Sequence, residues 1–341
     1  MNAHETRAAE IAAGILRGER GTLARAITLA ESSRDDDQEL ASQVITNVLP
    51  ATGKALRLGV SGPPGVGKSS FVEALGCHIL DRHRVAVLAI DPSSPRTGGS
   101  ILGDKTHMEE LARSERAFIR PSPGGTSFGG SSFGGSSFGG NTLGGVAAHT
   151  REAILLCEAA GHDVVLVETI GVGQSEYAVA DLCDLLLLLV QPGAGDELQG
   201  IKRGIMEVAD ALVVTKADGD LTAPARRAHQ DLVAAIHVRH ASAPMPPVFV
   251  CSARERTGFA ELWREISACH AGWVESGEIA RRRAAQDLRW FEREIEVQVV
   301  KRFLAQSSVA AAMPIVIAEI RERRTTPLVA ARRMVRSVLG G

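Results

Sequence analysis

A glycine-rich segment, GPPGVGKSS, runs from Gly62 to Ser70 and constrains the fold more than any other feature of the chain. It follows the apolar run LRLGVS and precedes the helical segment FVEALGCHIL, which is the order that a phosphate-binding P-loop requires. Its glycines let consecutive backbone N–H groups face one concavity, and the helix N-terminus adds its positive dipole end. The predicted phosphate-binding residues are Gly62, Pro63, Pro64, Gly65, Val66, Gly67, Lys68, Ser69 and Ser70.

Short runs of leucine and β-branched residues alternate with helical segments across the middle of the chain. Continuous apolar runs of this length indicate a parallel sheet with both faces covered by helices. Together with the P-loop they predict an α/β fold of the P-loop NTPase type. The runs are LRLGVS, VAVLAI, DVVLVE, DLLLLLV, DALVVT and PVFVC.

Three parts are predicted along the chain. Residues 1–50 form a small helical preface, residues 51–257 the P-loop domain, and residues 258–341 a helical arm for dimerisation or partner binding. Within the P-loop domain, residues 126–141 read TSFGGSSFGGSSFGGN. One interpretation is a flexible loop expansion, because glycine-rich backbone is costly to order. The other is that the three spaced phenylalanines dock on a partner.

Composition narrows the class of protein. The net charge of −2 gives no general attraction for nucleic acid or for an anionic membrane. The arginine run Arg281 to Arg283 is interpreted as a solvated helix face. The five cysteines have no metal-site spacing and are expected to be free thiols. The first residues resemble neither a signal nor a transit peptide, and the longest apolar run is too short to span a bilayer, so we expect a cytoplasmic protein.

Carboxylates that could hold Mg²⁺ follow the predicted strands. The run DVVLVE ends in Glu168, VAVLAI is followed by Asp91, and the next loop carries Asp104. Mg²⁺ takes few carboxylates together with waters and phosphate oxygens, so these three cannot all be direct ligands. Asp104 and Glu168 are the candidates for the inner or water-bridged shell, with the hydroxyl of Ser69. Asp91 is a candidate to orient these ligands without binding the metal itself.

A second motif, TKAD, concerns the base of the nucleotide. Asp218 could accept hydrogen bonds from the ring N–H and the amine of guanine, while the stem of Lys216 lies along the base. Adenine would leave this carboxylate unpaired, so guanine should be favoured by a factor on the order of 10⁴. Thr215 stands where asparagine is usual, so it keeps a hydroxyl but lacks the amide that normally ties this loop to the P-loop. Ser252 and Ala253 follow the last strand and match the short loop behind the guanine carbonyl.

Longer segments carry a family resemblance. They include DPSSPRTGGSILGDKTHM, TLGGVA, VETIGVGQSEYAVAD and GAGDELQGIKRGIMEVADALVV, and they resemble the MeaB/ArgK family of GTPases from about Arg7 to Leu262. The resemblance implies a homodimer that binds GTP or GDP with Mg²⁺. It also implies docking on an adenosylcobalamin-dependent acyl-CoA mutase and cofactor delivery from an adenosyltransferase, with adenosylcobalamin held by the partner.

The resemblance also implies roles for individual segments. Asp91 to Asp104 resembles switch I, Glu168 to Tyr177 resembles switch II, and Gly193 to Lys202 resembles a further mobile loop. The implied catalytic residues are Lys68, Asp104, Glu168 and Lys202. No glutamine directly follows Gly171, where Ras-like proteins position the attacking water, so intrinsic hydrolysis should be slow and partner-dependent.

Two other functions remain open. One is an ATP-dependent kinase or transport ATPase for basic amino acids, which the TKAD motif opposes. The other is a GTPase for metal insertion, which would need clustered soft ligands. A nucleotide competition assay would separate the first alternative from a GTPase.

Overall fold

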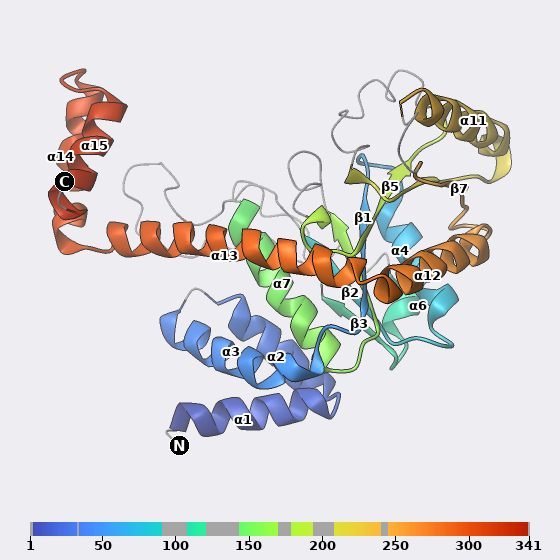
Figure 1. The fold of residues 1–341 in the computed structure, drawn as a ribbon, viewed down its shortest axis with the longest axis horizontal. Helices are drawn as coiled ribbons and strands as arrows, with labels where there is room; N and C mark the ends of the chain where they lie inside the picture. The colour runs from blue at the N-terminus through green and yellow to red at the C-terminus, as the bar shows by residue number, and fades with distance from the viewer. Residues whose placement is uncertain are drawn as a thin grey trace. The chain divides into compact units, whose positions relative to one another are not determined.

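The computed structural model describes residues 3–32, 34–90, 108–120, 143–169, 179–193, 208–239 and 245–339 (Figure 1). These residues form two compact units. The first unit ends at Ala284 and the second begins at Ala285, so the boundary falls inside the long helix α13. The first unit contains the sheet, and the second contains helices alone.

The described strands form one seven-stranded parallel sheet in the order β3-β2-β4-β1-β5-β6-β7. β1, β4, β5 and β6 are buried along their whole length, as expected for a parallel sheet covered on both faces. The predicted α/β fold is therefore confirmed. The strands are β1 (Leu56–Ser61), β2 (Val85–Ile90), β3 (Ala117–Arg120), β4 (Val164–Thr169), β5 (Leu185–Val190), β6 (Ala211–Val214) and β7 (Val248–Val250).

The central position of β1 places the P-loop. β1 pairs with β4 on one side and with β5 on the other, and the strand order runs outward in opposite directions from there. Ligands of open α/β sheets bind at such a switch point, beyond the carboxyl ends of the strands. The register opposes Val60 to Glu168, so the end of β1 and the predicted carboxylate of β4 reach the same edge.

Helices cover both faces of the sheet. α4, α6 and α12 lie on one side of the sheet (Figure 1). There the ring of Phe71 from α4 contacts that of Phe259 from α12. α11 packs on Leu212 and Val214, which point to the opposite face. α7 packs against the N-terminal helices α1 to α3. The helices of the first unit are α1 (Ala3–Leu16), α2 (Arg20–Ala30), α3 (Asp35–Val48), α4 (Lys68–Ile79), α6 (Glu109–Ala112), α7 (Leu143–Ala159), α11 (Thr222–Arg239) and α12 (Phe259–Glu275), with short 3₁₀ helices at Leu49–Ala51 and Gly219–Leu221.

The edge of the sheet at which the strands begin, here called the amino edge, holds a network of buried and partly buried ion pairs. Arg283, at the start of α13, binds Asp184 at 2.7 Å, and Arg282 binds Asp210 at 2.9 Å. Arg57 of β1 binds Glu158 of α7 at 2.6 Å. The interpretation of the arginine run as a solvated face is therefore wrong for Arg282 and Arg283, because acidic residues before β5 and β6 lie within their reach.

The second unit contains most of α13 (Glu278–Leu304), followed by α14 (Ser307–Arg321) and α15 (Pro327–Leu339). Its small core is formed by Val309 and Val316 of α14 with Ala330 and Met334 of α15. No single helix among the described residues is long and apolar enough to cross a membrane; α13 and α14 satisfy the length and composition criteria only as a pair bent by 81°. α12 belongs to the core of the first unit, so a functional arm over residues 258–341 stays a prediction.

Candidate nucleotide-binding site

The P-loop between β1 and α4 depends on glycine at defined positions. Gly62, Gly65 and Gly67 have φ values of 155°, 75° and 94°, a region that favours glycine. A Cβ atom at Gly62 would lie 2.7 Å from the carbonyl oxygen of Leu189. Gly67 occupies the N-cap position of α4 in a left-handed conformation. These glycines allow the loop to turn tightly beside β5 and to enter the helix that begins at Lys68.

Lys68 is the first residue of α4, and its side chain turns back over the P-loop. Its ammonium group donates hydrogen bonds to the carbonyl oxygens of Gly62 at 2.8 Å and Pro63 at 3.2 Å. Only 9% of the residue is exposed. A positive charge is thus held at the N-terminus of a helix, where backbone N–H groups already favour an anion. This arrangement suits a phosphate group.

Ser69 and Glu168 lie together, as the sequence predicts. The hydroxyl of Ser69 donates a hydrogen bond to Oε1 of Glu168 at 2.7 Å, and this carboxylate is buried near the end of β4. Thr169 follows, and its hydroxyl donates to the hydroxyl of Ser61 at 3.3 Å. A hydroxyl and a carboxylate at this spacing are hard oxygen ligands of the kind that Mg²⁺ prefers. The pair therefore fits a magnesium site beside the P-loop.

The TKAD motif and the loop after β7 also come together. The hydroxyl of Ser252 donates to Oδ2 of Asp218 at 2.5 Å, and it accepts from the N–H of Glu255 at 3.0 Å. The N–H of Ala217 donates to the carbonyl of Cys251 at 3.2 Å. Because Ser252 is fully buried, its hydrogen bond holds one carboxylate oxygen of Asp218 in a fixed position. Ala253 follows at the half-buried position next to it.

Thr215 ties the base loop to the P-loop directly. Its buried hydroxyl donates to the carbonyl oxygen of Val66 at 2.8 Å. Lys216, with a φ of 53°, adds a hydrogen bond from its ammonium group to the carbonyl of Gly65 at 2.5 Å. The hydroxyl that threonine keeps therefore makes a tie to the P-loop in place of the missing amide. Only the packed structure shows that the Val66 carbonyl lies within reach of the shorter side chain.

Several predicted residues lie outside the described part of the chain. They stay predictions, as do the segments resembling switches and the glycine-rich repeat at 126–141. These residues are Asp91, Asp104 and Lys202.

One buried histidine lies just before β4, outside the predicted site. His162 is buried, and its Nδ1 lies 3.1 Å from the carbonyl oxygen of Cys157. Burial lowers the pKa of His162 from 6.5 to about 4, because desolvation disfavours the charged ring. Nothing in the sequence distinguishes His162 from the other histidines. It lies at the amino edge, far along β4 from Glu168, so its titration concerns stability more than binding.

Comparisons with known proteins point to one family. Residues 23–308 match the sequence model of the family described as methylmalonyl Co-A mutase-associated GTPase MeaB. The chain is 43% identical to the GTPase ArgK of Escherichia coli, a match that covers 89% of this chain and 88% of that protein. It is 42% identical to the methylmalonic aciduria type A homolog, mitochondrial, of Mus musculus, over 89% of this chain and 72% of that protein.

A solved structure shares the whole architecture. The crystal structure of an LAO/AO transport system kinase covers 99% of this chain, and 99% of that chain is covered in return, with a TM-score of 0.71 and 34% sequence identity. The P-loop, the Ser69–Glu168 pair and the TKAD loop are the parts that a nucleotide-hydrolysing member of such a family needs. The extent of the family match and the identity to its relatives show that this chain belongs to the MeaB family of P-loop GTPases.

Proposed function

We propose that this chain is a GTP-hydrolysing chaperone that docks on an adenosylcobalamin-dependent acyl-CoA mutase. It would gate the loading of cobalamin and protect or reactivate the mutase, with an adenosyltransferase as a second partner. The observation that carries the proposal is the joined P-loop and TKAD loop in a chain whose family is described as mutase-associated. The mouse relative is named for methylmalonic aciduria, which supports the same partner.

The geometry of Asp218 supports guanine as the base. Ser252 occupies its Oδ2 atom, which leaves Oδ1 and the remaining lone pairs for donors on a base. Guanine supplies two donors on one edge, whereas adenine supplies an acceptor at the corresponding ring nitrogen. An unpaired carboxylate in a partly buried site is costly. GTP and GDP are therefore the proposed ligands.

The phosphate end would be held by the P-loop backbone and Lys68. Ser69 and Glu168 would hold Mg²⁺ directly or through water, with Asp104 as a second carboxylate and Asp91 orienting them. When bound, Mg²⁺ neutralises charge on the β- and γ-phosphates. The chain's own contribution is to position the phosphates and to present fixed positive charge from Lys68 and the helix N-terminus.

The proposal can be tested through the effect of the mutase on the rate of GTP hydrolysis. The chain has no glutamine directly after Gly171, so we propose that Lys202, in the segment resembling a mobile loop, couples the mutase to hydrolysis. GTP hydrolysis should accelerate when the mutase is added. Lys202→Ala should reduce this acceleration more than it reduces the affinity for GDP. A rate that does not respond to any acyl-CoA mutase would contradict the proposal.

An ATP-dependent kinase remains the second candidate, because the matched crystal structure is described as a transport system kinase. A calorimetric titration separates the two. A GTPase of the proposed kind binds GDP far more tightly than ADP, whereas comparable affinities would favour the kinase. The control is Asp218→Asn, which should narrow the difference between the two nucleotides.

We also propose a homodimer through the second unit. One face of α13 presents a row of exposed apolar side chains, flanked by Glu292 and Glu296. The outward face of α15 presents exposed Leu328 and Val335 beside Arg332 and Arg336. The two faces are complementary in charge, so α15 of one copy fits α13 of another. The α13 row is Leu288, Phe291, Ile295 and Val299, with exposed fractions of 58%, 62%, 47% and 54%.

Light scattering tests this dimer. Reversing the α15 charges (Arg332→Glu with Arg336→Glu) should give a monomer, and so should reversing the α13 charges (Glu292→Arg with Glu296→Arg). Mixing the two variants should restore the dimer, because in the mixed dimer each α15 meets an α13 of opposite charge. A dimer that survives both changes would place the interface elsewhere.

A further inference from the structure

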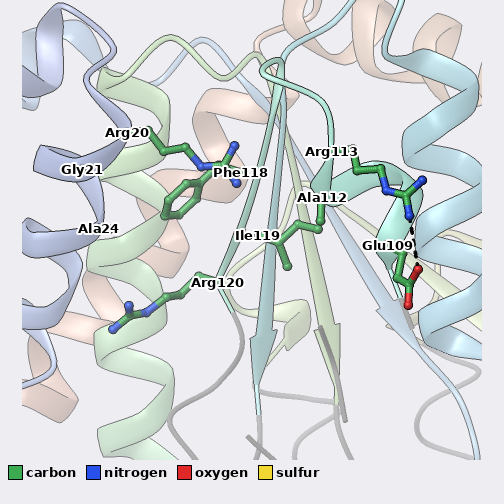
Figure 2. Close-up of a pocket in the computed structure, with 9 residues that line it drawn as sticks. All are labelled: Arg20, Gly21, Ala24, Glu109, Ala112, Arg113, Phe118, Ile119 and Arg120. Atoms are coloured by element: carbon green, nitrogen blue, oxygen red, sulfur yellow. Dashed lines mark ion pairs between the residues drawn. The ribbon is translucent and has the colours of Figure 1, made fainter. Parts of the chain in front are cut away.

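One lateral edge of the sheet carries a groove unrelated to the nucleotide site. β3 is the edge strand and pairs only with β2 among the described residues. A groove of about 840 Å³ lies along it. Figure 2 shows side chains of β3 between α2 on one side and α6 on the other. Ala24, Ala112 and Ile119 supply apolar surface to this groove.

Ile119 directs both of its backbone polar groups into the groove. In a parallel ladder the backbone groups of alternate residues point toward opposite neighbours, and the register of β3 on β2 places those of Ala117 and Ile119 on the outer side. The groups of Ala117 are used: its N–H donates to the carbonyl of Ser114, and its carbonyl accepts from Arg20 at 3.0 Å. The N–H and C=O of Ile119 have no partner within the described ranges.

One wall of the groove is held in place by arginines. Arg20, at the start of α2, lies with its guanidinium 5.9 Å from the ring centroid of Phe118 (Figure 2). Arg120, at the end of β3, forms an ion pair with Glu31 just beyond α2. Both ends of α2 are thus attached to β3. The groove therefore keeps its shape without an occupant.

The other wall adds a positive charge that can change partners. Arg113 pairs with Glu109 at 3.5 Å, and the two side chains are 81% and 66% exposed. Such an exposed pair contributes little stability, so Arg113 can turn to a ligand at low cost. The residues that line the groove include three arginines and one glutamate, and the groove favours an anionic occupant.

We propose that this groove binds an extended peptide with acidic side chains, which adds to β3 as a further strand. Its backbone would pair with the N–H and C=O of Ile119, the mode by which exposed sheet edges capture peptides. Because successive side chains of a strand point to opposite sides, two neighbouring acidic residues would face opposite walls, one toward Arg20 on α2 and the next toward Arg113 on α6. Apolar residues next to them would contact Ala24 and Ala112.

A second copy of this chain fits the groove less well. Pairing of β3 with β3 would bring the arginines of two grooves together, and like charges oppose that association. A small anion would satisfy the arginines and leave Ile119 unpaired. An acidic extended peptide satisfies both sets of groups. This site goes beyond the proposed GTPase function and does not depend on it.

Fluorescence anisotropy tests the proposal on the full chain with a labelled, end-capped peptide in which pairs of glutamate alternate with pairs of valine, so that each wall meets both residue types. Ile119→Pro removes the outward N–H and leaves the pairing to β2, a change that edge strands tolerate. It should weaken binding about tenfold, whereas Ile119→Val should not. Arg113→Glu should weaken binding similarly, while Arg25→Glu, an exposed change on α2 outside the groove, should have little effect. GDP affinity should be unchanged in all four variants.

Other results would overturn the proposal. Absence of binding to the unmodified chain is one, and equal binding by the Ile119→Pro variant is another. Equal binding of a peptide with lysine in place of glutamate would show that the charges of the arginines do not select the ligand. Equal binding of a peptide with an N-methylated backbone would show that the peptide does not pair with β3 as a strand. Full competition by inorganic phosphate would assign the groove to a small anion. A dimer abolished by Ile119→Pro would assign it to a second copy.

Discussion

The two edges of the parallel sheet use polar side chains in different ways. At the carboxyl edge, Lys68, Thr215 and Lys216 donate to backbone carbonyls of the P-loop. At the amino edge, charged side chains that are largely shielded from water pair with one another, as in Arg283–Asp184 and Arg57–Glu158. Groups that hold a loop can still turn to a ligand, whereas buried ion pairs cannot exchange partners without leaving a charge unpaired. The first edge is therefore suited to binding and the second to stability.

The largest expected effect is on the amino edge. Arg283→Ala leaves the fully buried carboxylate of Asp184 without its main partner and should lower the free energy of unfolding by about 3–5 kcal/mol. The neighbouring change Arg281→Ala, at a side chain that is 68% exposed, should cost less than about 0.5 kcal/mol. Urea unfolding of the GDP-free chain measures both. Similar losses would show that the buried pair has no special role.

The corresponding loss of a cation at the carboxyl edge, where the strands end, should change binding and leave stability nearly unchanged. Lys68→Ala removes the cation that faces the phosphates and should weaken GDP binding by about 100-fold. Its hydrogen bonds to Gly62 and Pro63 hold only the P-loop backbone, so the thermal midpoint of the nucleotide-free chain should change little. Calorimetry and thermal unfolding give the two values. A large loss of stability would mean that the two edges are not functionally separate.

Acid should damage the amino edge first. Burial depresses the pKa of His162 to about 4 from 6.5, so its neutral form stabilises the fold above pH 6.5. This contribution is lost as the pH falls from 6.5 toward 4, on the order of 2–3 kcal/mol in total. The slope of unfolding free energy against pH in this window should flatten in His162→Gln. An unchanged slope would assign the acid sensitivity to other groups.

The smallest expected effect concerns the tie between the two nucleotide loops. Thr215→Val removes the donor to the Val66 carbonyl and should weaken GDP binding about tenfold, while Thr215→Ser should restore it. Because Thr215 acts on the P-loop, GDP and IDP should weaken equally. A changed ratio between them would mean that the substitution moves Asp218 instead.

Much of this architecture can be predicted from the sequence because it depends on local patterns. The P-loop is contiguous, and its glycines are required by its own backbone conformation. The apolar runs LRLGVS and DLLLLLV form β1 and β5 because a strand buried on both faces needs apolar residues at every position. Asp218 and Ser252 are predicted to serve one site because the TKAD motif and the short loop after the last strand each match part of a guanine site.

Other features depend on which distant residues the fold brings together. Thr215 reaches Val66, and Arg283 reaches Asp184, across separations of 149 and 99 residues. The sequence shows a threonine in place of an asparagine and a run of arginines, and each has an ordinary local interpretation. Whether a polar side chain finds a partner is set by sheet order and by helix packing, which determine burial and therefore the strength of the interaction. The sequence by itself determined the fold class and the nucleotide motifs, and the tertiary structure decided which polar groups are paired and which, as at Ile119, remain open to a partner.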